Sequence, residues 1–175
     1  GLPDSAKDAA RQSAKDKLER KDGDEPCWRF TLQAPSISPV LEYLEDDSIR
    51  KEIWEAATRI GWQDEWENTE VIDRILNLRL EKATLLGKDD FADVALSRRM
   101  AKNGHKADAF VSDLRDKTAE AFSRENKELE AFKAQKTEGE NSLLEPWEVA
   151  YWAEKQKQEL YAFDEEELRP YFPID

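Results

Sequence analysis

The residues best suited to chemistry in this sequence are one histidine, His105, and one cysteine, Cys27. Catalytic zinc needs about three protein ligands, which usually include two histidines spaced on one helix, as in H-E-x-x-H. A second histidine is not present, and Cys27 lies far from His105 along the chain. The sequence therefore predicts no metal ligand and no bound cofactor in these 175 residues.

Nucleophilic catalysis is also poorly supported. A serine or cysteine nucleophile normally needs a base within reach, and His105 is the only histidine that could serve. Because His105 follows Gly104 in a sequence typical of a loop or a first helical turn, we expect an exposed, structural side chain. Cys27 begins an apolar segment, and we interpret it as a small apolar residue. We therefore predict no catalytic residue.

Two further groups of residues invite a functional interpretation. The run Glu165–Glu167 stands in a predicted first helical turn, where the helix dipole favours carboxylates, so we interpret it as structural. Trp147, Tyr151 and Trp152 could line a peptide groove, although their helical spacing is more typical of a core. The six glycines do not form a phosphate-binding loop, and no cofactor-binding residue is predicted.

The charge balance excludes several partners. Forty acidic and 27 basic residues give a net charge of −13. Nucleic acids and anionic membrane surfaces both require clustered basic residues, so neither is an expected partner. There is no run of 18 apolar residues, and the opening GLPDSAKDAARQ lacks the apolar segment of a signal peptide. With a single cysteine, these features favour a reducing, cytoplasmic location.

The elements that would position any site are mostly helical, because apolar residues recur with a period near 3.6. The predicted helices cover residues 4–21, 39–61, 68–87, 90–102, 106–135 and 146–161. A short terminal helix is expected after Asp164, which begins a sequence typical of a capping box. Trp28, Phe30 and Leu32 alternate with polar residues and predict a strand over residues 27–32. The predicted fold is all-α, with residues 1–175 as a single helical region. It is an irregular multi-helix array with one long helix and at most one or two short edge strands.

Two long stretches have sequences that are more specific than helical periodicity alone requires. They are ENTEVIDRILNLRLEKATLLGKDDFADVALSRRMA, residues 67–101, and EPWEVAYWAEKQKQELYAFDEEELRPYFP, residues 145–173. Both resemble the oligopeptidase A type of the thimet-oligopeptidase family of zinc metallopeptidases, in the same order and at similar spacing. GLPDSAKDAA and WRFTL also resemble segments of that family, so the resemblance extends over essentially the whole chain.

The resemblance implies a cytoplasmic peptidase that cleaves short peptides inside a deep, mostly helical channel. In that family zinc is bound by an H-E-x-x-H helix and a further glutamate, downstream of the YFP segment, and no motif of this kind occurs here. The matched region departs from the family pattern at Lys88, where an aromatic residue is usual, and at Glu148, where Asp is common. Neither departure bears on catalysis, and no catalytic residue is carried over.

The leading hypothesis is a non-catalytic helical fragment of a zinc-dependent oligopeptidase, inactive alone. Its partners would be the rest of that peptidase, and short peptides would be substrates of the whole enzyme. The alternative is a free-standing acidic helical module for protein interaction, without enzymatic activity. A truncated paralogue that regulates a peptidase is a third hypothesis. Apolar surface that lacks its neighbours should also promote self-association.

Overall fold

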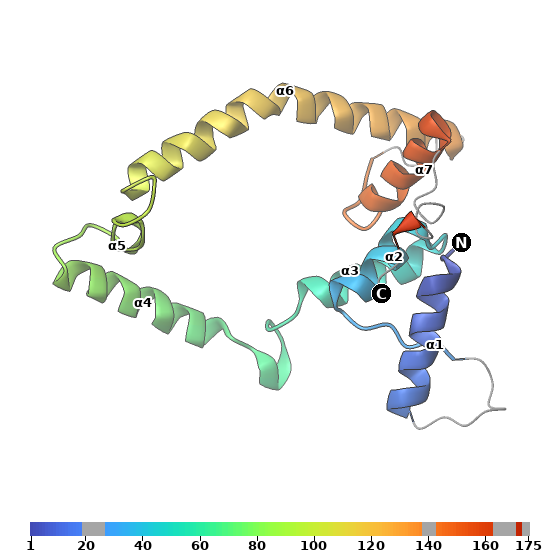
Figure 1. Cartoon of the computed structure of the whole chain (residues 1–175), viewed down its shortest axis with the longest axis horizontal. Helices are drawn as coiled ribbons and strands as arrows, with labels where there is room; N and C mark the ends of the chain where they lie inside the picture. The colour runs from blue at the N-terminus through green and yellow to red at the C-terminus, as the bar shows by residue number, and fades with distance from the viewer. Residues whose placement is uncertain (19–26, 138–142, 163–170, 173–175) are drawn as a thin grey trace. The chain divides into compact units, whose positions relative to one another are not determined.

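The computed structural model describes residues 1–18, 27–137, 143–162 and 171–172 (Figure 1). In these residues the chain forms seven α-helices and one short 3-10 helix, and it forms no strand. The predicted all-α fold class is therefore confirmed. The chain divides into two compact units that share one long helix.

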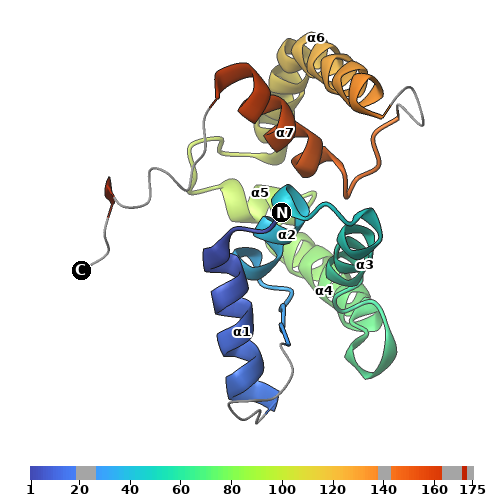
Figure 2. The same cartoon turned by 90° about the vertical axis from the view of Figure 1, so that its right-hand side faces the viewer.

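Unit 1 comprises residues 1–58 and 127–175. Its helices are α1 (Asp4–Leu18), α2 (Ala34–Tyr43), α3 (Asp47–Thr58), α7 (Val149–Tyr161) and the C-terminal part of α6 (Gly104–Lys136). The central element is α2, which packs against α1, α3 and α7. Figure 2 shows α7 beside the end of α6.

Apolar side chains from three helices form the core of unit 1. Val40 of α2 is only 1% exposed, and α6 contributes Leu129 and Phe132. The small side chains of Ala10 and Ala14 are the buried positions of α1. Because α1 buries only alanines, it contributes little apolar area, and most of the hydrophobic stabilisation of the unit comes from α2, α6 and their neighbours.

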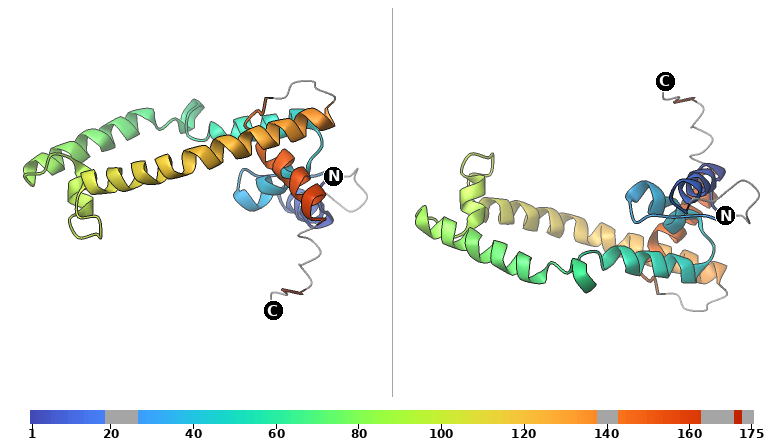
Figure 3. Two further views of the ribbon diagram at one scale, coloured as in Figure 1. Left: turned by 90° about the horizontal axis from the view of Figure 1, so that it is seen from above. Right: turned by 90° about the horizontal axis from the view of Figure 1, so that it is seen from below.

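Unit 2 comprises residues 59–126. Its elements are η1 (Asp64–Trp66), α4 (Thr69–Leu85), α5 (Phe91–Leu96) and the N-terminal part of α6. α4 packs against α5, and the turn between them contains Gly87 at φ +66°, the left-handed conformation expected of a glycine that follows a helix. α6 has 33 residues and is drawn from yellow to orange in both views of Figure 3.

The single helix predicted over residues 39–61 is wrong, because the chain forms α2 and α3 there, separated by residues 44–46. The second helix begins where the Asp46 carboxylate accepts hydrogen bonds from the N–H groups of Ser48 (3.0 Å) and Ile49 (3.2 Å). The first helix starts earlier than predicted, with Pro35 in its first turn, where a missing N–H needs no partner.

The strand predicted over residues 27–32 is also not formed. Its alternating pattern is real, but the described residues offer no second strand with which it could pair. Instead the Arg29 N–H donates to the carbonyl of Ala10 in α1, over 3.0 Å. Trp28 and Phe30 line an apolar cleft together with residues of α2 and α3, so the alternation reflects an irregular segment with one partly covered apolar side.

The helix predicted over residues 90–102 is shorter than expected and ends at Leu96. Turns follow it, and Lys102 adopts φ +70°, which a continuing α-helix does not allow. Asn103 then starts α6 by accepting a hydrogen bond from the N–H of Lys106, over 2.9 Å.

The other predicted helices, 4–21, 68–87, 106–135 and 146–161, correspond to α1, α4, α6 and α7. Residues 19–21 and the helix predicted after Asp164 lie outside the described residues.

Candidate functional site

The two residues best suited to chemistry, Cys27 and His105, belong to different units of the chain. His105 is exposed in the first turn of α6, and Cys27 is half-buried before α2. Glu165–Glu167 lie outside the described residues. Within the described ranges, no group of three or more His, Cys, Asp or Glu side chains is arranged to hold a metal ion. The contacts that the structure does show among the candidate residues are those of the aromatic side chains.

Trp147, Tyr151 and Trp152 do gather, around the start of α7. Trp147 packs against Trp54 of α3 with ring centroids 5.9 Å apart. Trp152 makes edge-to-face contacts with Tyr151 at 5.2 Å and with Phe132 of α6 at 6.3 Å. Such pairs are favourable beyond the area they bury. The three residues thus join α3, α6 and α7, and each is half-buried. The two clefts described below have other linings.

Arg50 of α3 is the charged residue at the centre of this cluster, and it is 2% exposed. Its guanidinium donates to the carbonyls of Leu44 and Glu45 and to the Asp47 carboxylate, over 2.7 Å in the last case. It also stacks on the Tyr151 ring, 4.2 Å from the centroid. One side chain therefore holds the turn between α2 and α3 against α7.

The neighbouring groups complete this arrangement. The Trp147 indole N–H donates to both oxygens of Asp47, at 3.1 and 3.2 Å. Burial raises the pKa of the Tyr151 hydroxyl, although the charge of Arg50 acts in the opposite direction. Asp47 thus accepts hydrogen bonds from α3 and from the segment before α7 together.

A second buried charge lies where α6 approaches the start of α7. The Lys133 ammonium is 2.6 Å from a carboxylate oxygen of Glu148, and both residues are less than 9% exposed. Lys133 also donates to the carbonyl of Leu143 at 2.8 Å, and Glu148 accepts from the N–H of Glu145 at 2.9 Å. A buried pair of this kind is tolerable because further hydrogen bonds satisfy both partners.

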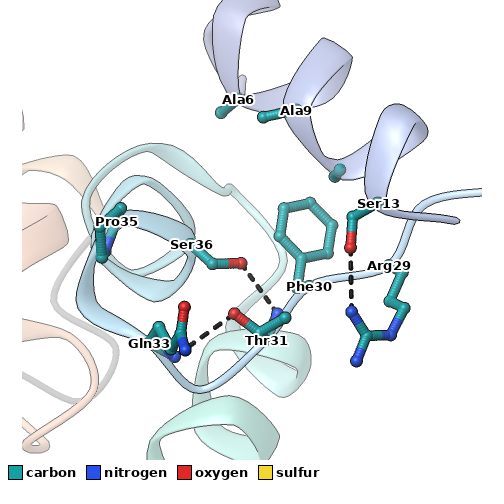
Figure 4. Close-up of a pocket in the computed structure, with 10 residues that line it drawn as sticks. Ala6, Ala9, Ser13, Arg29, Phe30, Thr31, Gln33, Pro35 and Ser36 are labelled. Atoms are coloured by element: carbon teal, nitrogen blue, oxygen red, sulfur yellow. Dashed lines mark hydrogen bonds between the residues drawn. The ribbon is translucent and has the colours of Figure 1, made fainter. Parts of the chain in front are cut away.

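A partly polar cleft of about 270 Å³ lies between α1 and the segment that leads into α2 (Figure 4). On its floor Arg29 donates to the Ser13 hydroxyl at 3.0 Å, and the Thr31 N–H donates to the Ser36 hydroxyl at 2.8 Å. Figure 4 shows the Phe30 ring between these two pairs. These hydrogen bonds pair polar groups of the cleft with one another.

A second cleft of unit 1, of about 280 Å³, is apolar. Its lining residues are Leu2, Lys7, Trp28, Phe30, Val40, Leu44, Ile49 and Ile53. With only the Lys7 side chain to carry charge, the cleft can hold an apolar side chain but offers no acid, base or nucleophile. Trp28 is 45% exposed at its rim.

Comparison with known proteins identifies the family. The sequence model of peptidase family M3 matches residues 40–175, which is more than half of the chain. The chain belongs to this family. It is 39% identical to oligopeptidase A of Haemophilus influenzae, 37% to that of Salmonella typhimurium and 35% to a probable cytosolic oligopeptidase A of Arabidopsis thaliana. These M3 relatives are matched over 99% of the chain but only 25% of their own length.

The structure adds residues that the sequence alone did not single out. Arg50 and Lys133 look like ordinary surface charges in amphipathic helices, since Lys and Arg are rarely fully buried. In the sequence, Glu148 differs from the family pattern, but this difference does not predict its burial. The one available signal was its place beside Trp147, because a charge within an aromatic run needs a partner if the run is buried.

Proposed function

We propose that these 175 residues form a non-catalytic helical part of a zinc-dependent oligopeptidase that cleaves short peptides. The observation that carries the proposal is the extent of the match: the whole chain aligns with oligopeptidase A proteins, but it spans only about a quarter of their length. The remaining length of such a protein has room for the catalytic residues. The whole enzyme would act on peptides in the cytoplasm.

The residues present do not fit a zinc site. The described ranges lack a cluster of three ligand side chains, and the one histidine of the sequence is exposed. We therefore assign zinc to a part of the longer protein outside this chain and derive no reaction step from these residues. The role of these 175 residues is structural: they form a helical wall of the enzyme. Arg50 and Lys133 fix how α3, α6 and α7 meet in unit 1.

The purified 175-residue chain tests this assignment. Mass-spectrometric metal analysis after dialysis should show far less than one zinc per chain, and a fluorogenic peptide should not be cleaved. The Haemophilus influenzae relative, assayed in parallel, serves as the positive control. Cleavage by the 175-residue chain that persists through further purification and stops with a chelator would show that the assignment is wrong.

The gene gives an independent test. The reading frame that continues after the codon for Asp175 should encode an H-E-x-x-H motif. A stop codon directly after Asp175 would instead favour a free-standing helical interaction module, because no zinc site could then belong to the same polypeptide.

A further inference from the structure

The helix α4 is apolar around most of its circumference. Its apolar positions, with the residue that follows it, are Val71, Ile72, Ile75, Leu76, Leu78, Leu80, Ala83, Leu85 and Leu86. At 3.6 residues per turn these positions spread over roughly 220° of the helix. A helix that packs on one side only needs an apolar stripe of about 100°. The polar remainder is narrow and consists of Glu70, Asp73, Arg74, Asn77, Glu81 and Thr84.

Within unit 2, α5 covers only one part of this apolar surface. Ala83 is fully buried, and the N–H of Lys88 donates to its carbonyl at 2.9 Å. On the same side, Arg79 and Lys82 lie over the ring of Phe91, at 5.2 and 5.9 Å from its centroid. The seven larger apolar side chains of α4, together with Leu86, remain between 41% and 79% exposed. Exposure of this extent on a soluble protein marks an interaction surface.

The distribution of charge agrees with an interface in unit 2. Unit 2 contains 12 basic and 14 acidic residues, whereas unit 1 contains 15 basic and 26 acidic residues. Almost all of the net charge of −13 therefore belongs to unit 1. Because unit 2 has almost no net charge, it does not repel an approaching partner of either sign, whereas the acidic unit 1 repels an acidic one.

We infer that α4 is a docking helix for a segment of the longer M3 peptidase that lies outside these 175 residues. The docking surface consists of two stripes on either side of the part taken by α5. One stripe is formed by Val71, Leu78 and Leu85, and the other by Leu76 and Leu80. The segment that binds to this surface carries aliphatic or aromatic side chains and little charge. This inference rests on the proposed function.

The length of the relatives favours this occupant over a second copy. About three quarters of each oligopeptidase A relative lies outside the matched region, so a partner is present in every molecule at high effective concentration. A second copy would bring another net charge of −13 to the complex, which opposes association.

Hydrogen exchange measured by mass spectrometry tests the inference on two proteins, the 175-residue chain and the longer protein encoded by its gene. Amides in residues 71–86 should exchange at least roughly tenfold more slowly in the longer protein, because docking suppresses local opening of the helix. The same amides in the 175-residue chain should exchange at a rate that does not depend on protein concentration.

Two matched double variants sharpen the test. Leu76→Lys with Leu80→Lys places two charges on the docking surface, and Asn77→Lys with Thr84→Lys places the same charges on the polar side of α4. Lysine and leucine have similar helix propensities, so the first pair should not change the circular dichroism of the 175-residue chain. In the longer protein the first pair should lower Tm by several degrees, because the charges are buried without partners, whereas the second pair should leave it unchanged.

The outcomes separate the alternatives. Equal exchange of residues 71–86 in both proteins, or equal Tm values for both double variants, overturns the docking inference and leaves the proposed function intact. Protection of the 175-residue chain that rises with concentration also overturns it, because a second copy then occupies α4. A gene that ends directly after Asp175 overturns the proposed function and the inference together.

Discussion

The Lys133–Glu148 pair places two opposite charges in the interior of unit 1, 2.6 Å apart. Removing one partner of a buried pair leaves the other charge uncompensated, which is more harmful than losing both. The two residues come from α6 and from the segment before α7, so the pair fixes how these elements meet. Variants that remove one partner or both partners separate the cost of an unpaired buried charge from the net contribution of the pair.

We expect Lys133→Met to lower the free energy of unfolding by about 3–5 kcal/mol, because the Glu148 carboxylate is then buried without a cation. The double variant Lys133→Met with Glu148→Leu should recover part of this loss. Urea denaturation followed by circular dichroism measures both. An exposed lysine of the same helix, Lys117, gives the control Lys117→Met, which should change stability by less than about 0.5 kcal/mol. Equal losses in both lysine variants would contradict a special role for the buried pair.

Asp46 gives a prediction about pH. Hydrogen bonds from the Ser48 hydroxyl and the N–H of Ile49 lower the pKa of its carboxyl below the ordinary value of 3.8. A carboxyl whose pKa is lower in the folded state stabilises the fold above the unfolded-state pKa, and this contribution disappears as the pH falls through the folded-state value. Asp46→Ala should therefore destabilise the protein near neutral pH.

The difference in Tm between Asp46→Ala and the unchanged protein should shrink steadily as the pH is lowered below 3.8. Calorimetric scans at several pH values would measure it. A constant difference across that range would show that the charge of Asp46 has no part in holding the start of α3.

At the scale of elements, α7 ends on a residue in an unfavourable backbone conformation. Ala162 has φ 47° and ψ 42°, the left-handed region, while its N–H donates to the carbonyl of Gln158. Side chains with a Cβ are disfavoured there, and glycine is not. Ala162→Gly should therefore raise the free energy of unfolding by up to about 1 kcal/mol.

Ala153→Gly, at an exposed position inside the same helix, is the matched control and should lower the free energy of unfolding by about 1 kcal/mol. Thermal unfolding followed by circular dichroism compares the two. The interpretation of the cap fails if the same substitution is destabilising at both positions.

Helical periodicity was enough to predict the fold class and the long helix, because both depend on residues three and four apart. Periodicity does not indicate the division of residues 39–61 into two helices, because that division depends on the side chain of Asp46, which caps the start of α3. The strand at residues 27–32 was wrong for a different reason. Alternation shows that one side of a segment is apolar, but a strand also needs a partner, which is a property of distant sequence.

The candidate site was predictable only in part. The expectation that these residues hold no metal rests on composition, because one histidine limits what can be assembled, and it stays a prediction. The burial of Arg50 could not be predicted, since it depends on the approach of Tyr151 from α7, about 100 residues later in the sequence. Periodicity within α3 contains no information about that contact.

At the scale of the whole molecule, apolar burial is unequal between the units. Among the described residues, the buried apolar side chains of unit 1 are Ala10, Ala14, Val40, Leu129 and Phe132, whereas unit 2 has Ala83. Local stability follows the density of buried apolar contacts. In the 175-residue chain we therefore expect the amides of α2 and α7 to exchange with solvent more slowly than those of α4.

Native-state hydrogen exchange at low denaturant concentration would measure this order. If both units lost protection at the same denaturant concentration, the chain would unfold as one cooperative body, and the unequal burial would have no consequence for stability. Separate loss would identify unit 2 as the part that opens first.

The hydrogen bond between Trp147 and Asp47 joins residues 100 positions apart in the sequence. A ribosome adding about 5–20 residues per second needs roughly 5–20 seconds to make that intervening chain. For this interval α2 and α3 are already synthesised, while α7, which covers them, does not yet exist. Unit 1 therefore completes its fold late in synthesis, and the nascent chain must keep the apolar side of α2 from aggregating until α7 arrives.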